Sequence, residues 1–196
     1  MASNALPARS SARRPVRRAA LLASAAALVA VPLAVAGATP ALATTGVSIS
    51  SGGQLNVSAG DVDNNILIYV EGSSIVVKNF SDVLTANSGC TKGADGGVRC
   101  ASAGLTKIQI STGDGVDSVV NSTALPSKVF LNRGGDYFLG GSARDTVFGD
   151  EDDDTIEGNG GSDVIVGGPG DLDRAFGGGG FDYCSAETRN SCEGDA

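Results

Sequence analysis

The 196-residue sequence contains no histidine, no tryptophan and a single methionine. Without histidine, the chain cannot form Ser-His-Asp or Cys-His nucleophiles, a His-Glu-x-x-His zinc site or any imidazole general base. Paired carboxylates are present, as a glycosidase would need. However, with only three Tyr and six Phe, there is little material for an aromatic sugar platform. These absences predict a protein that is not an enzyme.

Basic residues are also scarce in most of the chain. Five of the 14 lie within residues 1–43, whereas all 22 acidic residues follow that segment. Residues 44–196 therefore carry nine basic and 22 acidic side chains, a net charge of about −13. A charge of this sign argues against nucleic-acid partners and anionic membrane surfaces, and bound cations would relieve its self-repulsion.

Residues 1–43 have the composition of a signal peptide. Basic residues come first, an apolar stretch follows over residues 19–36, and Ala41-Leu42-Ala43 forms a small-residue cleavage site. We expect cleavage before Thr44, no membrane insertion afterwards and a secreted product. The alternative is an uncleaved anchor, against which Pro32 and the cleavage site argue. Arginine pairs leave both the general and the twin-arginine export routes open.

All four cysteines follow the leader and fall into two close pairs, Cys90 with Cys100 and Cys184 with Cys192. An even number of cysteines in an exported chain predicts disulfides. A thiolate metal site would need Cys-x-x-Cys spacing or histidine partners, and the sequence has neither. The second disulfide is expected to fold the C-terminal tail over the open end of the fold, because repeat structures need such caps.

A nine-residue pattern, Gly-Gly-x-Gly-x-Asp-x-apolar-x, recurs from Gly140 to Asp182. Three copies follow without gaps, the next has one extra residue near Leu172, and degenerate copies extend upstream to Thr112. Such a short fixed period predicts a parallel β-solenoid, in which each unit buries its apolar face only when a neighbour stacks on it. The alternative, a disordered acidic tract, disagrees with the apolar residues at the eighth place of successive copies. These are Phe138, Val147, Ile156, Ile165 and Ala175.

The glycines and aspartates of the pattern predict calcium ligands. Glycine adopts positive φ freely, so each loop curls and turns carbonyl oxygens inward. Ca²⁺ takes six to eight oxygen ligands, so one loop with one Asp supplies about half a shell and a second loop must supply the rest. If two copies make one coil, the predicted pairs are Asp136 with Asp154, Asp145 with Asp163, Asp154 with Asp173, and Asp163 with Asp182. The expected carbonyl ligands are those of Gly140, Gly149, Gly158, Gly160, Gly177 and Gly179.

The four predicted sites are not equivalent. The site between Asp163 and Asp182 has glycine at most turn positions and is expected to be the best. Ala143 replaces a glycine in the loop that ends at Asp145, and the extra residue near Leu172 disturbs the loop that ends at Asp173. Asp150 and Asp152 occupy turn positions, where we expect them to raise the local negative potential.

Residues 44–110 are rich in β-branched residues between Gly, Asn and Ser turns, and we expect strands continuous with the solenoid. A separate small β domain that ends near Ala103 is the alternative. Asp61, Asp63 and Asn65 match the start of an EF-hand, but the glycine and bidentate glutamate that this loop needs are missing. The sequence therefore divides into a signal peptide (1–43), a β-rich segment (44–110), a nonapeptide β-roll (111–183) and a disulfide-closed cap (184–196) in an all-β protein.

The repeats from Gly140 to Asp182 resemble those of the RTX (repeats-in-toxin) calcium-binding β-roll. The complete layout is similar to that of small secreted calcium-binding proteins of actinobacteria. This resemblance implies that each calcium ion lies between successive loops on one side of the roll.

The expected function is that of a secreted calcium-binding protein in which binding is coupled to folding. The alternative is a wall-associated structural or adhesive protein in which calcium has only a structural role. A third hypothesis, that the repeats serve as a secretion signal, is weaker because the chain has its own N-terminal leader. The sequence indicates no protein or cell-wall partner.

Overall fold

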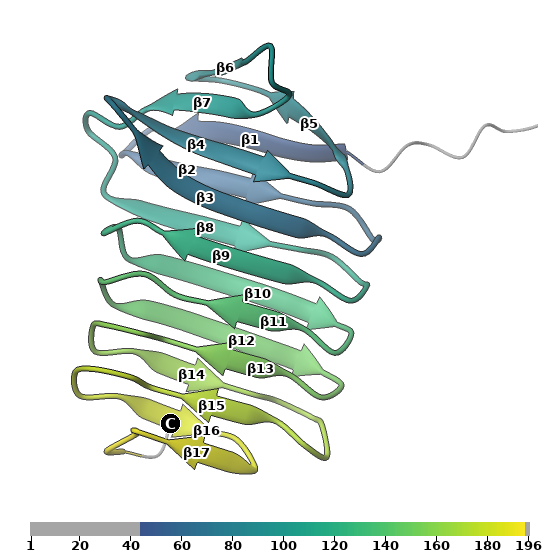
Figure 1. Cartoon of the computed structure of the whole chain (residues 1–196), viewed down its shortest axis with the longest axis vertical. Helices are drawn as coiled ribbons and strands as arrows, with labels where there is room; N and C mark the ends of the chain where they lie inside the picture. Colours follow the sequence, from purple (N-terminus) through teal and green to yellow (C-terminus); the bar gives the residue numbers. More distant parts are fainter. Residues whose placement is uncertain (1–43, 195–196) are drawn as a thin grey trace, which may run out of the picture. The chain divides into compact units, whose positions relative to one another are not determined.

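The computed structural model describes residues 44–194, and the predicted signal peptide lies outside them. All regular structure in this part of the chain is β, arranged as two sheets that stack coil upon coil (Figure 1). Across residues 44–194, no helix is long and apolar enough to cross a membrane.

The first sheet has eight strands in the order β16-β14-β12-β10-β8-β2-β1-β5. β1 pairs with β2 antiparallel and with β5 parallel, and every pair from β2 to β16 is parallel. The strand bounds are Thr44–Ser50 (β1), Gln54–Ser58 (β2), Val83–Ala86 (β5), Lys107–Ser111 (β8), Ser127–Arg133 (β10), Asp145–Glu151 (β12), Val164–Val166 (β14) and Tyr183–Ser185 (β16).

The second sheet has nine strands in the order β17-β15-β13-β11-β9-β3-β4-β7-β6. It is parallel from β17 to β3 and antiparallel from β3 to β6. The strand bounds are Asn65–Glu71 (β3), Ser74–Asn79 (β4), Cys90–Lys92 (β6), Val98–Ala101 (β7), Ser118–Ser122 (β9), Tyr137–Leu139 (β11), Thr155–Glu157 (β13), Arg174–Phe176 (β15) and Thr188–Asn190 (β17).

From β8 onward, consecutive strands alternate between the two sheets, so two strands make one coil. From β8 to β16 the pairing registers repeat at 18 or 19 residues, as in Val129↔Val147 and Ile165↔Cys184, whereas the last pair, β15 with β17, is 14 residues apart. This arrangement confirms the predicted all-β parallel roll. It follows from the nine-residue period, because two copies of the pattern return the chain to the same sheet.

The segment before β8 is built differently. Hairpins β1–β2 and β3–β4 add antiparallel strands to the two sheets, and β6–β7 extends the second sheet further. Because β2 pairs with β8 and β3 with β9, this segment continues both sheets of the roll. β5 and β6 are the outermost strands at this end (Figure 1).

One apolar side chain from each repeat strand fills the space between the sheets. The residues predicted for the eighth place are all buried, from Phe138 at 0 % exposed to Ala175 at 1 %. Cys184 takes this place in the last copy and is also fully buried. The flanking residues of each strand point outward, which explains why strands as short as three residues suffice.

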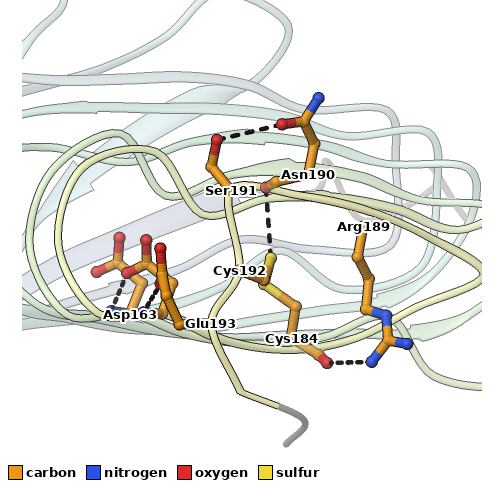
Figure 2. Close-up of a disulfide and its surroundings, with 8 residues drawn as sticks. Asp163, Cys184, Arg189, Asn190, Ser191, Cys192 and Glu193 are labelled. Atoms are coloured by element: carbon orange, nitrogen blue, oxygen red, sulfur yellow. Dashed lines mark hydrogen bonds between the residues drawn. A yellow bond between two sulfur atoms is a disulfide. The ribbon is translucent and has the colours of Figure 1, made fainter.

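Both predicted disulfides are present, Cys90–Cys100 between β6 and β7 and Cys184–Cys192 at the C-terminus. Figure 2 shows the second disulfide with Glu193 next to it. The tail that it anchors pairs with the last coil, because the backbone N–H groups of Glu193 and Gly194 donate to the carbonyl of Asp182. The tail thereby closes the end of the last loop.

Removal of one core side chain should destabilise the roll measurably. We expect Ile165→Ala to lower the free energy of unfolding of the calcium-loaded chain by about 2–4 kcal/mol, because the cavity cannot collapse between two sheets. The matched control is Leu172→Ala, whose side chain is 61 % exposed and which should change stability by less than about 0.5 kcal/mol. Urea denaturation of both variants checks this, and equal effects would contradict the packing described.

Candidate metal centre

The loops that join the two sheets stack along two edges of the roll. Edge 1 is formed by the loops that end at Asp117, Asp136, Asp154 and Asp173, and edge 2 by the loops that end at Asp145, Asp163 and Asp182. All seven carboxylates are at most 3 % exposed. Each edge therefore carries a buried column of aspartates, one per coil.

The aspartates of edge 1 form a hydrogen-bonded ladder. The backbone N–H of Asp117 donates to Oδ1 of Asp136 at 2.7 Å. Asp136 N–H donates in the same way to Asp154 at 2.9 Å, and Asp154 N–H to Asp173 at 2.8 Å. The Asp173 N–H donates to the Glu187 carboxylate at 2.9 Å, which ends the ladder.

Edge 2 repeats this ladder. Asp145 N–H donates to Oδ1 of Asp163 at 2.7 Å, and Asp163 N–H donates to Oδ1 of Asp182 at 2.8 Å. Glu193 ends this ladder by accepting from Asp182 N–H at 2.7 Å (Figure 2). The structure thus brings together each of the four aspartate pairs that the 18-residue spacing indicates, whereas their role as calcium ligands stays a prediction.

The second oxygen of nearly every ladder aspartate is buried without a hydrogen-bond donor. A buried acceptor in this state costs about 1–3 kcal/mol, and more when it is charged. Repeating this cost along both edges favours either a bound cation or a proton on these oxygens. The oxygens concerned are Oδ2 of Asp117, Asp136, Asp154, Asp163, Asp173 and Asp182.

Burial also shifts the titration of these groups. It raises the pKa of Asp136 to about 8, and repulsion from the neighbouring Asp117 and Asp154 acts in the same direction. Burial raises the pKa of Asp154 and of Asp163 to about 7. Without a cation, the ladders consequently favour protons over full ionisation near neutral pH.

In the loops that begin with glycine, Oδ2 of the ladder aspartate lies beside that glycine. A Cβ on Gly158 would collide with Oδ2 of Asp163 and with the carbonyl of Gly177 in the next coil. A Cβ on Gly140 would collide with Oδ2 of Asp145 and the carbonyl of Gly158. The first glycine is therefore required for space, so that a carboxylate oxygen and a carbonyl oxygen of the next loop can converge.

Other predicted carbonyl ligands already accept hydrogen bonds. Gly140 O accepts from Asn159 Nδ2 at 2.7 Å, and Gly179 O accepts from Gly161 N–H at 2.9 Å. Gly149 and Gly160 lie in the corresponding loops of edges 1 and 2.

The turn conformation tolerates some substitutions and not others. Asn132, Asp150, Asp152 and Asn159 have positive φ at turn positions where the pattern favours glycine. Asp150 and Asp152 are exposed, and their charges help to raise the pKa of Asp154. Local side-chain hydrogen bonding makes Asn and Asp the residues that best replace glycine here.

The loop that contains Ala143 departs from the others. Neither Gly141 nor Ala143 adopts a positive φ, and Gly141 N–H turns inward to donate to Oδ2 of Asp145 at 3.1 Å. Ser127 donates both its N–H and its hydroxyl to Oδ1 of this aspartate. Asp145 is therefore the one ladder aspartate within residues 44–194 whose two carboxylate oxygens both have donors.

The extra residue near Leu172 is absorbed without breaking edge 1. Leu172 projects into solvent, and its N–H and that of Asp171 both donate to Oδ1 of Asp153 at 3.0 Å. The Asp154–Asp173 rung keeps the geometry of its neighbours. The insertion is thus an outward bulge.

Three residues of the ladders were not among the site residues predicted from the sequence. Asp117 continues edge 1 by one coil, and its degenerate copy of the pattern, Thr112–Asp117, is the signal that could have identified it. Glu187 and Glu193 lie 14 and 11 residues after the aspartates that they contact. This spacing breaks the period, so no repeat analysis would find them.

The residues present fit a hard divalent cation. The candidate donors are carboxylate and carbonyl oxygens, which Ca²⁺ prefers and softer metals do not. In residues 44–194, no group of three or more His, Cys, Asp or Glu side chains converges. A site between two loops would accordingly combine two aspartates with main-chain carbonyls. A bound ion would neutralise the paired charges and join adjacent coils.

Fold and site together define a parallel β-roll whose two loop edges are columns of buried carboxylates. Residues 132–171 match the family model of the RTX calcium-binding nonapeptide repeat (4 copies). The chain therefore carries RTX repeats, which imply calcium binding and typically bind Ca²⁺ structurally. No curated protein and no solved structure matched the chain.

The pKa shifts predict an inverted pH dependence for the calcium-free fold. Asp136, Asp154 and Asp163 titrate near pH 7–8 when folded and near pH 4 when unfolded. Between these pH values the folded state binds more protons than the unfolded state, so the stability of the fold decreases as pH rises.

After calcium removal, the urea midpoint should be higher at about pH 5.5 than at about pH 8. With saturating calcium the order should reverse, because protons and calcium compete for the same oxygens. A calcium-free midpoint that rises with pH would contradict the buried ladders.

The space beside the first glycine can be tested within one loop. We expect Gly158→Ala to weaken calcium binding at least tenfold, about 1.4 kcal/mol, because the new Cβ displaces Asp163 Oδ2. Gly160→Ala is the matched control, since its Cβ would meet its nearest atom, Ser142 Cα, at an ordinary 3.6 Å. Isothermal titration calorimetry measures both. Equal affinities would show that the glycine serves no ligand geometry.

Proposed function

We propose that this protein is a secreted calcium-binding protein in which calcium binding and folding of the repeats are one process. The observation that carries the proposal is the set of six buried Oδ2 atoms without donors. Paired ionised carboxylates at this depth oppose folding, and a divalent cation between them converts repulsion into attraction.

Coupling to folding follows from where the ligands come from. Each predicted site takes its oxygens from two loops 18 or 19 residues apart, and these loops meet only after the coils have stacked. An unfolded chain therefore offers no preformed site, so the free energy of calcium binding becomes free energy of folding. Affinities of about 10⁻⁴ to 10⁻³ M would suit an extracellular module.

Secretion is supported by chemistry in the described part of the chain and by the sequence before it. Two disulfides close short loops, and such bonds persist in oxidising compartments. The leader-like composition of residues 1–43 points to the same compartment.

The role proposed is not catalytic. The lack of histidine supports this, as does the placement of the ladder carboxylates in the interior, where they face each other and not a substrate cleft. Calcium ions are the ligands that we propose.

The direct test is to titrate the oxidised chain with calcium and to record far-ultraviolet circular dichroism at each calcium concentration. We expect a saturable gain in β signal, with little response to magnesium, which demands octahedral geometry and releases water reluctantly. Asp163→Asn together with Asp182→Asn should shift the midpoint to at least tenfold higher calcium, because one interloop site loses both charges while side-chain volume is kept.

The matched control removes two exposed carboxylates, Asp114→Asn together with Asp171→Asn. It changes net charge equally and should move the midpoint less than about twofold, since exposed charges are screened. A spectrum that is folded and indifferent to calcium would refute the proposal. Equal shifts of the midpoint in the two double variants would mean that the calcium response depends on net charge alone and not on the buried aspartates.

A further inference from the structure

Edge 1 begins with a loop that has an asparagine in the ladder position. Asn64 is 2 % exposed and precedes β3, which pairs with β9 in the register Asn65↔Ser118. Its backbone N–H donates to Oδ1 of Asp117 at 2.7 Å, the same bond that each ladder aspartate makes with the next. Asn64 is therefore the first rung of edge 1, with an amide in place of the carboxylate.

The side-chain nitrogen of Asn64 is surrounded by oxygen. Nδ2 lies 3.1 Å from Gly60 O and 2.6 Å from Val62 O, both in its own loop. From the next loop it meets Thr112 O and Asp117 Oδ1, each at 3.0 Å. Three carbonyls and one carboxylate thus converge from two loops on a single nitrogen, which has only two protons to share among them.

The loop that ends at Asp154 has no side-chain amide among the equivalent oxygens, and its carbonyl partner Gly167 O accepts from the backbone N–H of Asp150 at 2.8 Å. In the loop that ends at Asp154, Oδ2 of Asp154 and the carbonyl of Gly167, the first residue of the next loop, crowd the same point beside Gly149. Asp154 Oδ2 has no hydrogen-bond partner. At Asn64, the corresponding carbonyl is Thr112 O, and it accepts a hydrogen bond from Nδ2. The amide supplies N–H groups where the aspartate loops need a cation.

The orientation of this amide is fixed by its surroundings. Asn79 Oδ1 accepts from the backbone N–H groups of Asn65 and Ser81, both at 3.1 Å. Asn79 Nδ2 must then point the other way, where it donates to Asn64 Oδ1 and to Thr45 Oγ1 at 2.8 Å. Because Asn64 Oδ1 accepts from Asn79, Asn64 Nδ2 faces the four oxygens.

We propose that the Asn64 amide replaces a calcium ion between the first two loops of edge 1. This inference rests on the proposed calcium binding of the aspartate loops. The first interloop position then takes no metal, and residues 44–111 with the coil that packs on them form a folded base without calcium. The first calcium site then lies between the loops that end at Asp117 and Asp136, and the calcium-dependent part extends from there toward the C-terminus.

Two equivalent backbone hydrogen bonds report on the two ends of the roll. Ser118 N–H donates to Asn64 O at 2.8 Å, and Tyr183 N–H donates to Asp163 O at 2.9 Å. In the oxidised chain with calcium chelated, hydrogen exchange should leave the Ser118 amide protected and the Tyr183 amide unprotected. Calcium should protect both. Comparable exchange of the two amides in chelator would overturn the proposal.

The variant Asn64→Asp restores an aspartate at the first rung. It should bind one more calcium ion per chain than the wild type, counted by equilibrium dialysis, and Ser118 protection should become calcium-dependent. The control Asn65→Asp makes the same change at the adjacent, exposed residue and should match the wild type in both readouts. An unchanged calcium count in Asn64→Asp, or failure of this variant to fold in saturating calcium, would overturn the proposal that the amide takes the place of a calcium ion.

The same data separate this inference from the proposed function. If the wild-type chain binds no calcium and Tyr183 exchange ignores it, the proposed function fails and this inference with it. If calcium protects Tyr183 but the Asn64→Asp count stays at the wild-type value, the inference alone fails.

Discussion

The constraint on which this structure depends is the burial of one carboxylate per loop along both edges of the roll. Stacking requires each aspartate to accept a backbone N–H from the previous coil through Oδ1. The same stacking removes Oδ2 from water and leaves six such oxygens without donors. The β ladder therefore cannot be completed at neutral pH without either protons or cations on these groups. The proposed coupling of calcium binding to folding rests on these carboxylates.

The other features of the chain serve this constraint. In the loops that begin with glycine, the absence of a side chain makes room for Oδ2 and a carbonyl of the next coil. The apolar eighth residues form a core only one side chain deep per strand. Different residues close the two ends of each ladder. At the C-terminal end, Glu187 and Glu193 accept hydrogen bonds from the last backbone N–H groups. At the N-terminal end, Asn64 and Ser127 donate to the first carboxylates.

Much of this could be predicted from the sequence, because the period fixes geometry. Nine residues per strand-loop unit place Asp145 beside Asp163 and Val147 beside Ile165 in any two-strand coil. The ends could not be predicted in the same way. Glu187, Glu193 and Asn64 act through spacings that occur once. The strands of residues 44–103 pair in hairpins and in non-consecutive pairs, with no period to fix their register. Ala143 marks its loop as a departure from the pattern, but nothing in the sequence indicates that Gly141 N–H turns inward to Asp145.

The most direct test of calcium between the rungs is a crystal structure of the calcium-loaded chain with an anomalous difference map. We expect peaks between consecutive loops of edge 1 from Asp117 onward and between Asp163 and Asp182 on edge 2. Their distances to carboxylate and carbonyl oxygens should be about 2.3–2.6 Å. Peaks confined to exposed carboxylates such as Asp114 or Asp171, with the buried ladders empty and unchanged, would contradict it.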